Sequence, residues 1–375
     1  MDTTRKICQV YVPSWYRTYG KKALEKIEEY LKVIKYYSFT GVYLISVWKD
    51  GGFDNGFDIV EYTPNSKFTM YGGWQELETF VGYAHNLGLT VGADVVPNHV
   101  SDKHYLAQKC LSGCPGYEDV LFIVSEKEAK QLKEKGVPSI FGKEPYSEVE
   151  GFTGQDKFVR TTFCDGHQLN LNWNSEAVKE YFGQMFHWFR TLYHFDFMRV
   201  DSGMILHEDV EKADPNNILA VFDAEKSVKA IREVAGKMPL YFEWFPDAFS
   251  LKPFEDDPLS FALACPNFAG GEYPKEWNHP KLVPFFGGHD QMPFYNRAKI
   301  EGFDGKAVYA KAMEAEAGIV FTDLQTRFGY MLTDKDLEVR WGDECFDADL
   351  NNPNKRYAAR RPINEFLSWL IPKIL

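Results

Sequence analysis

The stretch HFDFMRVDSG, residues His194 to Gly203, places two opposite charges inside a predicted strand. Arg199 and Asp201 are two positions apart, and side chains at i and i+2 of a strand point to the same side. A buried ion pair is a weak source of stability, because the cost of removing both charges from water can exceed their attraction. We therefore interpret this face as part of a reaction site.

Other charged residues stand at the ends of predicted strands. Glu243 ends the strand LYFEW, His289 and Asp290 follow the strand LVPFFGG, and His99 follows the strand TVGADVV. Each has a structural alternative, because a strand-end Asp often caps the next helix and a rim His is often a satisfied polar residue. Three carboxylates that converge from separate strands indicate chemistry, since neighbouring like charges raise pKa values and weaken a fold.

Paired carboxylates suit one reaction in particular. Two carboxyl groups about 5–5.5 Å apart perform retaining glycoside hydrolysis, one as nucleophile and one as acid/base. Asp201 is the predicted nucleophile, and Arg199 is expected to orient it and to lower its pKa. Glu243 is the predicted acid/base, with a pKa raised by its aromatic neighbours. Asp290 could stabilise an oxocarbenium-like transition state, while His99 and His289 could donate hydrogen bonds to sugar hydroxyls.

Short apolar strands alternate with amphipathic helices along the chain. Strands are predicted over residues 8–13, 41–46, 90–96, 195–201, 240–244, 260–265, 282–288 and 329–333. Helices are predicted over residues 21–37, 74–88, 175–194, 306–324 and 364–375. Eight strands, mostly separated by helices, predict an α/β fold in which a closed (β/α)8 TIM barrel carries its catalytic groups at the carboxyl ends of the strands. A doubly wound open sheet is the alternative.

The alternation breaks after the third strand. Residues 99–166 form an excursion too long for an ordinary connection, with one polar helix predicted over 125–136. We interpret it as a small inserted domain. The predicted division is therefore 1–98 for the first part of the barrel, 99–166 for the insert, and 167–375 for the remainder.

Composition excludes several functions. The 375 residues carry a formal net charge of −12, which argues against a nucleic-acid surface and favours a neutral or cationic ligand. No apolar run approaches the roughly 20 residues that span a bilayer, so no membrane partner is expected. Six scattered cysteines and a start without an apolar signal core favour a cytoplasmic protein, although a secreted protein that has lost its signal would look the same. Cys110, Cys114 and His104 could bind a metal ion, but no second Cys/His pair completes a tetrahedral site.

Four segments of the chain resemble the ordered signature segments of the α-amylase family, glycoside hydrolase family 13. They are ADVVPNH, FMRVDSG, YFEW and FFGGHD. HQLNLNWNSEAV is similar to a fifth, weaker segment, and NGFDIVEY is similar to the stretch that approaches the scissile sugar. The resemblance runs from about Val10 to the final helix, and four segments in register make it specific.

The resemblance implies roles for individual residues. Asp201 matches the family's nucleophile, Glu243 its acid/base and Asp290 its transition-state stabiliser. Positions that contact the sugar or the nucleophile correspond to Asp58, His99, Arg199 and His289. Asp94 and Asn98 correspond to structural positions, and in some members the Asn binds calcium.

Departures from the family pattern narrow the expected function. Met204 and Ile205 replace a Lys-His pair that contacts leaving-side sugars in α-amylases, which favours short substrates. Phe57 replaces a Tyr and loses its hydroxyl. Leu169 and Asn170 replace Pro and Asp, and the loop PSWYRTYG lacks an acidic calcium loop. No cofactor is therefore expected, and calcium is not supported.

The chain stops at SWLIPKIL, where most members continue into an antiparallel β domain. The resemblance thus implies the oligosaccharide or α-glucosidase-like branch without the C-terminal β domain, as a minimal barrel or a shortened chain. The expected activity is retaining hydrolysis of short α-glucosides or α-glucan oligosaccharides. A transglucosidase or isomerase acting on sucrose, trehalose or malto-oligosaccharides remains an alternative, as does a non-catalytic carbohydrate-binding barrel. The oligomeric state stays open.

Overall fold

The computed structural model describes most of the chain between residues 6 and 322. The described residues are 6–36, 39–53, 56–68, 70, 73–137, 145–149, 158–161, 166–203, 205–206, 222–244, 249–264, 279–286, 304, 307 and 318–322. The predicted site residues His289 and Asp290 lie outside this set, as do the predicted strand 329–333 and the predicted helix 364–375.

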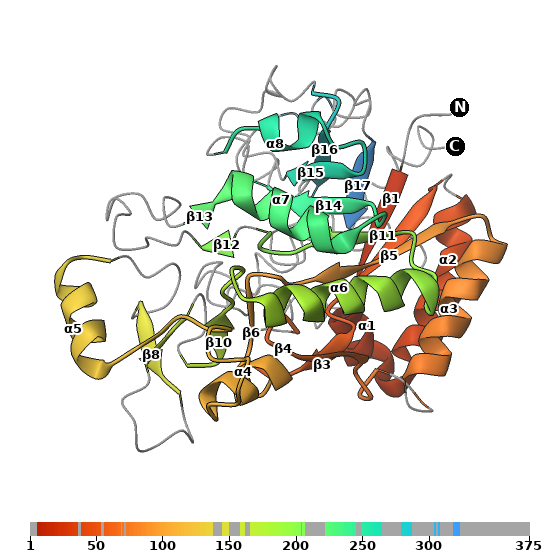
Figure 1. Ribbon diagram of the computed structural model, residues 1–375. Helices are drawn as coiled ribbons and strands as arrows, with labels where there is room; N and C mark the ends of the chain where they lie inside the picture. Colours follow the sequence, from red (N-terminus) through yellow and green to blue (C-terminus); the bar gives the residue numbers. More distant parts are fainter. Residues whose placement is uncertain are drawn as a thin grey trace.

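Eight parallel strands close into a barrel (Figure 1). In chain order they are β1 (Lys6–Tyr11), β2 (Gly41–Ile45), β5 (Thr90–Val95), β11 (Phe197–Val200), β14 (Leu240–Glu243), β15 (Ser260–Ala264), β16 (Leu282–Phe286) and β17 (Ile319–Thr322). Their order around the barrel is β1-β17-β16-β15-β14-β11-β5-β2, and β1 pairs with β2 to close the ring. The predicted (β/α)8 barrel is confirmed, and seven of its strands overlap the predicted ranges.

The eighth strand corrects one prediction. The sequence pattern placed residues 306–324 in a helix and the last strand at 329–333, whereas Ile319–Thr322 form β17. Gly318 directly precedes β17 and has a φ of 103°, a left-handed conformation that suits glycine. The four residues that follow it are β-branched or aromatic, which favours a strand. Val320 is buried and pairs with Ile7 of β1 and Phe285 of β16.

The strands form because their residues are apolar on both faces. All five residues of β2 are buried, as are five of the six in β1, which is typical of parallel strands covered by helices. Aromatic rings cross several strands: Phe197 lies 6.2 Å from Tyr43 and 5.2 Å from Tyr241 between ring centroids. Gly92 makes room for this row, since a Cβ there would lie 2.5 Å from the Phe197 ring.

Helices cover the outside of the barrel (Figure 1). They are α1 (Val12–Tyr19), the 3-10 turn η1 (Gly20–Lys22), α2 (Ala23–Tyr36), α3 (Trp74–Asn86), α6 (Glu176–Thr191), α7 (Ala224–Ala235) and α8 (Lys252–Glu255). In α6 the buried residues recur at helical spacing, which fixes the face that packs on the strands. Two short pairs lie outside the barrel sheet: β3 (Trp48–Asp50) with β4 (Ile59–Pro64), and β12 (Ile205–Leu206) with β13 (Phe222–Asp223).

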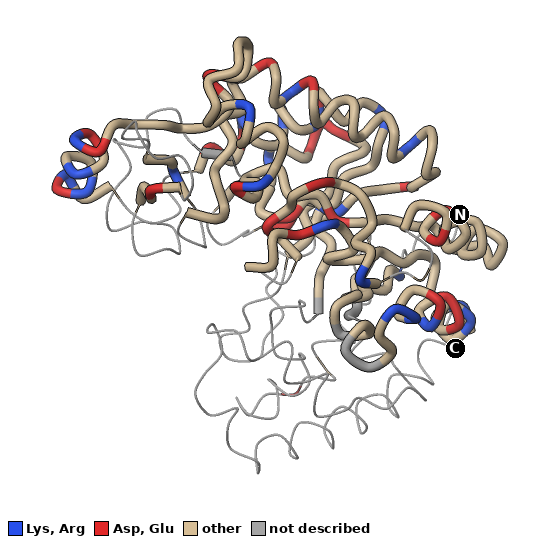
Figure 2. The backbone as a smooth tube through the Cα atoms, turned by 90° about the horizontal axis from the view of Figure 1, so that it is seen from below, with Lys and Arg blue, Asp and Glu red and all other residues tan. Residues whose placement is uncertain are grey.

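The excursion after β5 has structure of its own. It contains β6 (His99–Ser101), α4 (Tyr105–Leu111), β7 (Ile123–Val124), α5 (Glu126–Glu134), β8 (Tyr146–Glu148), β9 (Phe158–Arg160) and β10 (Gln168–Asn170). Figure 1 shows α5 and β8 projecting to one side of the barrel, and Figure 2 shows charges of both signs around this outlying helix. A second, small hydrophobic cluster lies there, and β6 pairs with β10, so both ends of the excursion meet. The exact domain boundaries stay a prediction.

Among the described residues, no helix is both long enough and apolar enough to cross a membrane.

Candidate active site

Three charged side chains meet where β11 and β14 end. Arg199 lies on β11, Asp201 follows that strand directly, and Glu243 is the last residue of β14. Arg199 Nη1 forms an ion pair with Asp201 Oδ1, and Arg199 Nη2 lies 2.9 Å from Glu243 Oε1. The two strands are parallel neighbours, with Arg199 opposite Tyr241, so their carboxyl ends lie side by side. One guanidinium thus contacts both predicted catalytic carboxylates.

The three groups differ in their access to solvent. The side chain of Arg199 is 1% exposed and that of Asp201 is 9% exposed, whereas that of Glu243 is 28% exposed. Burial acts to lower the pKa of Arg199, but the charges of Asp201 and Glu243 outweigh it and raise that pKa. The guanidinium therefore stays cationic at every pH at which the protein is folded.

The environment of Asp201 differs from the expectation in one respect. Burial raises the pKa of the Asp201 carboxyl, the Arg199 guanidinium lowers it, and the Glu243 charge raises it. The net direction is upward, because removing the carboxylate from water outweighs the attraction to Arg199. Arg199 acts on the pKa in the predicted sense without reversing the effect of burial.

The backbone after β11 helps to hold both carboxylates. The Asp201 N–H donates to the Val95 carbonyl of β5 at 2.8 Å, which extends the barrel ladder to this residue. Ser202 then takes a left-handed φ of 42°, and its N–H donates to Glu243 Oε2 at 3.0 Å. Glu243 is therefore fixed through one oxygen by Arg199 and through the other by a backbone amide. The sequence carries no signal for this amide contact, because it depends on the turn after Asp201.

A further carboxylate, Asp94, lies on the strand on the other side of Arg199. It stands opposite Arg199 in the β5–β11 pairing and is fully buried. Its Oδ1 accepts the N–H of Ser46 at 3.3 Å. Burial raises the pKa of Asp94 to about 7, although Arg199 opposes the shift. The resemblance assigns this residue a structural role, and it is the register partner of Arg199 on the neighbouring strand.

His99 begins β6, in the segment after β5, and Asp58 directly precedes β4, in the segment after β2. His99 is buried, and its Nδ1 lies 3.2 Å from Asn98 Oδ1. Burial lowers the pKa of His99 to about 4, while a hydrogen bond with the Phe57 backbone opposes the shift. The imidazole is therefore neutral at pH 7. This contact places His99 beside the residue that precedes Asp58.

Asp58 is fully buried and is held by its own loop. Its Oδ2 accepts the Phe53 N–H at 3.1 Å, and its carbonyl accepts the Gly51 N–H at 3.0 Å. A Cβ on Gly51 would overlap the Asp58 carboxylate and would lie 2.7 Å from Ser101 Oγ. Glycine at this position lets the carboxylate approach the backbone.

The loop that precedes Asp58 contacts the segment after β5 through an aromatic stack. The Phe53 ring stacks on His167 with 3.5 Å between centroids, and Lys103 Nζ lies 5.2 Å from the Phe53 ring centre. Lys103 Nζ also donates to the Gly51 carbonyl at 3.2 Å. Pattern reasoning missed these residues, because the contacts join segments that are far apart in the sequence.

No metal centre forms among the described residues, where no group of three or more His, Cys, Asp or Glu side chains could hold an ion. Asn98 Oδ1 accepts the Nδ2–H of Asn170 at 2.8 Å, so the residue that binds calcium in some relatives is bonded to a neutral amide. His104 Nδ1 caps α4 by accepting the Leu106 N–H, and its Nε2 lies 3.0 Å from the Tyr181 hydroxyl.

The sequence matches a known family over much of the barrel. The family described as the catalytic domain of alpha amylase matches residues 9–238, which is more than half of the chain. The chain belongs to the α-amylase family. The match covers Asp201, and Glu243 lies five residues beyond it.

Curated relatives of this α-amylase-family chain are distant and longer. Maltase 1 of Drosophila virilis is 28% identical over 184 residues, which is 47% of this chain and 27% of the relative. Trehalose-6-phosphate hydrolase of Bacillus subtilis is 27% identical over 186 residues, 49% of this chain and 32% of the relative. Oligo-1,6-glucosidase of Heyndrickxia coagulans is 28% identical over 191 residues, 48% of this chain and 32% of the relative. The matched part thus spans about a third or less of each relative.

Solved structures share the fold of this α-amylase-family chain. The trehalose-6-phosphate hydrolase of Bacillus licheniformis aligns with a TM-score of 0.64 at 19% identity, covering 98% of this chain and 72% of the other. A variant of the trehalulose synthase MutB aligns with a TM-score of 0.65 at 17% identity, covering 96% and 74%. Both likenesses concern the fold.

Proposed function

We propose that this α-amylase-family protein is a retaining glycosidase that cleaves α-glucosidic bonds in short α-glucosides. One observation carries the proposal: Arg199 contacts Asp201 and Glu243 together at the carboxyl ends of neighbouring barrel strands. This is the end at which barrel enzymes place their catalytic groups, and paired carboxylates are what retaining hydrolysis requires.

In the proposed reaction, the two carboxylates have different tasks. Glu243 gives its proton to the glycosidic oxygen as the bond from that oxygen to the anomeric carbon breaks. Asp201 attacks the anomeric carbon with a carboxylate oxygen and forms a covalent glucosyl ester. Glu243, now ionised, removes a proton from water, whose oxygen attacks the anomeric carbon and releases Asp201. Two displacements return the product to its original anomeric configuration.

The greater exposure of Glu243 supports this assignment of roles. The acid/base must exchange a proton with the leaving oxygen and then with water, so it needs access to both. The nucleophile needs a fixed orientation, which the buried guanidinium and the Asp201 N–H bond to Val95 supply. The amide of Ser202 holds Glu243 through Oε2 at 3.0 Å without a net charge.

The remaining roles rest on the family resemblance. Asp290, as transition-state stabiliser, and His289, as a hydroxyl donor, are proposed from their sequence segment and lie outside the described residues. Asp58 and His99 are proposed to bind hydroxyls of the sugar in the cleavage subsite. The Nδ1–H of a neutral His99 donates to Asn98 Oδ1, so Nε2 is left as an acceptor for a sugar hydroxyl.

The proposed substrate class is a disaccharide or short oligosaccharide with α-linked glucose. The names of the relatives support it, since they include a maltase, an oligo-1,6-glucosidase and a trehalose-6-phosphate hydrolase. Met204 and Ile205, in place of a Lys-His pair, are a further reason to favour short substrates over starch.

Incubation with maltose, maltotetraose, isomaltose, sucrose and trehalose tests the proposal. Free glucose from at least one sugar is the expected product, measured by chromatography at low and high sugar concentration. New glycosides in place of free glucose would show that the protein is a transglucosidase and not a hydrolase. Sugar binding by calorimetry without turnover of any of the five would contradict an enzyme of this substrate class.

A further inference from the structure

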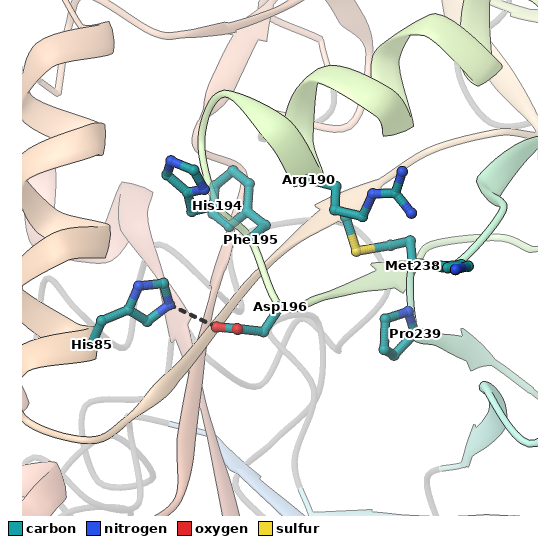
Figure 3. Close-up of a pocket in the computed structure, with 8 residues that line it drawn as sticks. His85, Arg190, His194, Phe195, Asp196, Met238 and Pro239 are labelled. Carbon is teal, nitrogen blue, oxygen red and sulfur yellow. Dashed lines mark hydrogen bonds and ion pairs between the residues drawn. The ribbon is translucent and has the colours of Figure 1, made fainter.

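A cavity adjoins the amino ends of two barrel strands (Figure 3). Its volume is about 470 Å³, and it is lined by His85, Arg190, His194, Phe195, Asp196, Lys237, Met238 and Pro239. Asp196 directly precedes β11 and Pro239 directly precedes β14. The cavity therefore adjoins the amino ends of these strands, whereas Asp201 and Glu243 stand at their carboxyl ends.

Basic side chains reach this cavity from three separate elements. His85 belongs to the last turn of α3, Arg190 to the last turn of α6, and Lys237 to the loop between α7 and β14. Within the described part of the chain, neither the Arg190 guanidinium nor the Lys237 ammonium group has a hydrogen-bond or ion-pair partner. Arginine and lysine carry their charge throughout the physiological range. Two cations without a carboxylate partner among the described residues thus line this cavity, on a chain whose net charge is −12.

The one carboxylate in the cavity is already engaged. Asp196 Oδ2 lies 2.8 Å from His85 Nε2 and accepts the Val91 N–H at 2.8 Å. Figure 3 shows the His85 ring turned to this carboxylate, while the Arg190 guanidinium extends away from it. Asp196 therefore fixes His85 and is turned away from Arg190.

The rest of the lining gives the cavity a fixed shape. Phe195 and Met238 are buried, so they form a packed base below the charged groups. His194 has a left-handed φ of 58°, a conformation that is uncommon outside glycine. His194 lies next to Phe195 in the lining of the cavity (Figure 3).

We propose that this cavity binds a small oxyanion of the phosphate class, free or as a phosphate monoester. The guanidinium of Arg190 can donate two parallel hydrogen bonds to phosphate oxygens, and Lys237 adds a mobile point charge. His194 adds a further donor at the edge. The site is independent of the glycosidase function proposed above.

The same cations have an alternative role, which is to stabilise the C-termini of nearby helices. α3, α6 and α7 all end beside this cavity, and a cation near a helix C-terminus offsets the negative end of the helix dipole. That role needs no bound anion, so anion titration separates the two explanations.

Calorimetric titration of the full chain with sodium phosphate, at constant ionic strength, tests the proposal. Saturable binding of one phosphate is expected, and the double variant Arg190→Gln/Lys237→Gln should bind roughly tenfold or more weakly, because two charge-assisted contacts are lost. The double variant Lys21→Gln/Lys229→Gln removes the same charge at exposed positions elsewhere and should bind like the wild type. Glucose 6-phosphate in a second titration distinguishes a phosphate ester from free phosphate by which of the two binds more tightly.

Proton NMR of the histidine rings locates the anion without relying on a variant. Phosphate should shift the ring signals of His85 and His194 with the same saturation curve that calorimetry gives. Lack of saturable binding by the wild type, or equal binding by the two double variants, would overturn the proposal and would leave the cations the role of offsetting the helix ends.

Discussion

Arg199 and Glu243 lie on neighbouring parallel strands of the barrel and form an ion pair, with 2.9 Å between Nη2 and Oε1. The same guanidinium contacts Asp201 through Nη1. A buried cation between two carboxyl groups offsets the repulsion that negative charge on them would cause, which in a low-dielectric interior is on the order of several kcal/mol. Arg199 and Asp201 therefore share one strand face in a run of apolar residues, where the guanidinium reaches Asp201 and Glu243 together.

Asp201→Asn should lower the glycosidase rate by several orders of magnitude while leaving the fold intact. The amide has the shape of the carboxylate but cannot form the glucosyl ester. Initial rates on the best sugar of the panel and far-ultraviolet circular dichroism provide the measurement. Asp256→Asn, at an exposed position, is the matched control and should keep full activity. Near-wild-type activity of Asp201→Asn would remove this residue from the mechanism.

Replacing Arg199 should move the acidic limb of the pH–rate profile to higher pH. Asp201 must be ionised to attack, and its pKa is already raised by burial. Because the Arg199 guanidinium lowers that pKa, its loss leaves burial unopposed, so activity disappears at a higher pH than in the wild type. The measurement is kcat/KM against pH.

Arg199→Lys keeps the charge but loses the forked contact, and it should give a smaller shift than Arg199→Met. Arg199→Met should also destabilise the protein by roughly 3–5 kcal/mol, since two carboxylates lose their common cation. An acidic limb that stays in place or moves to lower pH in both variants would contradict the electrostatic role of Arg199.

Asp94 should make folding stability fall as the pH rises. Its folded-state pKa of about 7 lies above that of the unfolded chain. Between the two values the folded protein holds a proton that the unfolded chain has released, so the free energy of unfolding decreases with rising pH until about pH 7. Linkage puts the decrease on the order of 4 kcal/mol, since one pKa unit corresponds to about 1.4 kcal/mol.

The variant Asp94→Asn cannot titrate and should lack this part of the pH dependence. Urea unfolding of both proteins at about pH 5 and pH 8 compares them, with the wild type losing more stability than the variant at the higher pH. The same slope in both proteins would show that Asp94 is ionised throughout the range.

Gly51→Ala should impair catalysis through Asp58. The added methyl group would overlap the Asp58 carboxylate and crowd Ser101 Oγ, so the carboxylate must move. A displacement of about 1 Å in a substrate-binding group can cost up to 100-fold in rate, and we expect a fall in kcat/KM of roughly 10–100-fold. Gly82→Ala in α3, where a Cβ meets nothing within 4 Å, is the matched control. Unchanged kinetics in Gly51→Ala would separate Asp58 from substrate binding.

Chelation of calcium should leave activity nearly unchanged. Asn98 Oδ1 is bonded to the Asn170 amide, which supplies no negative charge for a cation. Activity before and after EDTA treatment, with calcium added back, is the measurement. A large loss that calcium restores would show that an ion binds and that the Asn98–Asn170 bond opens to admit it.

Seven of the eight barrel strands could be predicted because parallel strands buried on both faces are short apolar runs between helices. The eighth could not, since the helix-like pattern predicted over residues 306–324 includes all of β17, and the positive φ of Gly318 just before this strand is not visible in the sequence. Local pattern reasoning weighs composition over a window, so four strand residues at the end of a helix-like pattern do not stand out.

The candidate site likewise has residues that could be predicted from the sequence and contacts that could not. Arg199, Asp201 and Glu243 could be found because strand-end charges are rare and all such ends meet at one rim. The contact between Arg199 and Glu243 depends on which strands are neighbours and on their register, which no local pattern contains. The Ser202 amide and the Phe53–His167 stack likewise follow from turns and from contacts between distant segments.

Proton NMR of the anomeric region during turnover tests the central claim most directly. The enzyme is added to the cleaved sugar beside an Asp201→Asn sample, and the first anomer released is recorded before mutarotation. We predict that α-glucose appears first and that the variant releases none on the same time scale. β-Glucose appearing first, or α-glucose released equally by the variant, would contradict a retaining mechanism with Asp201 as its nucleophile.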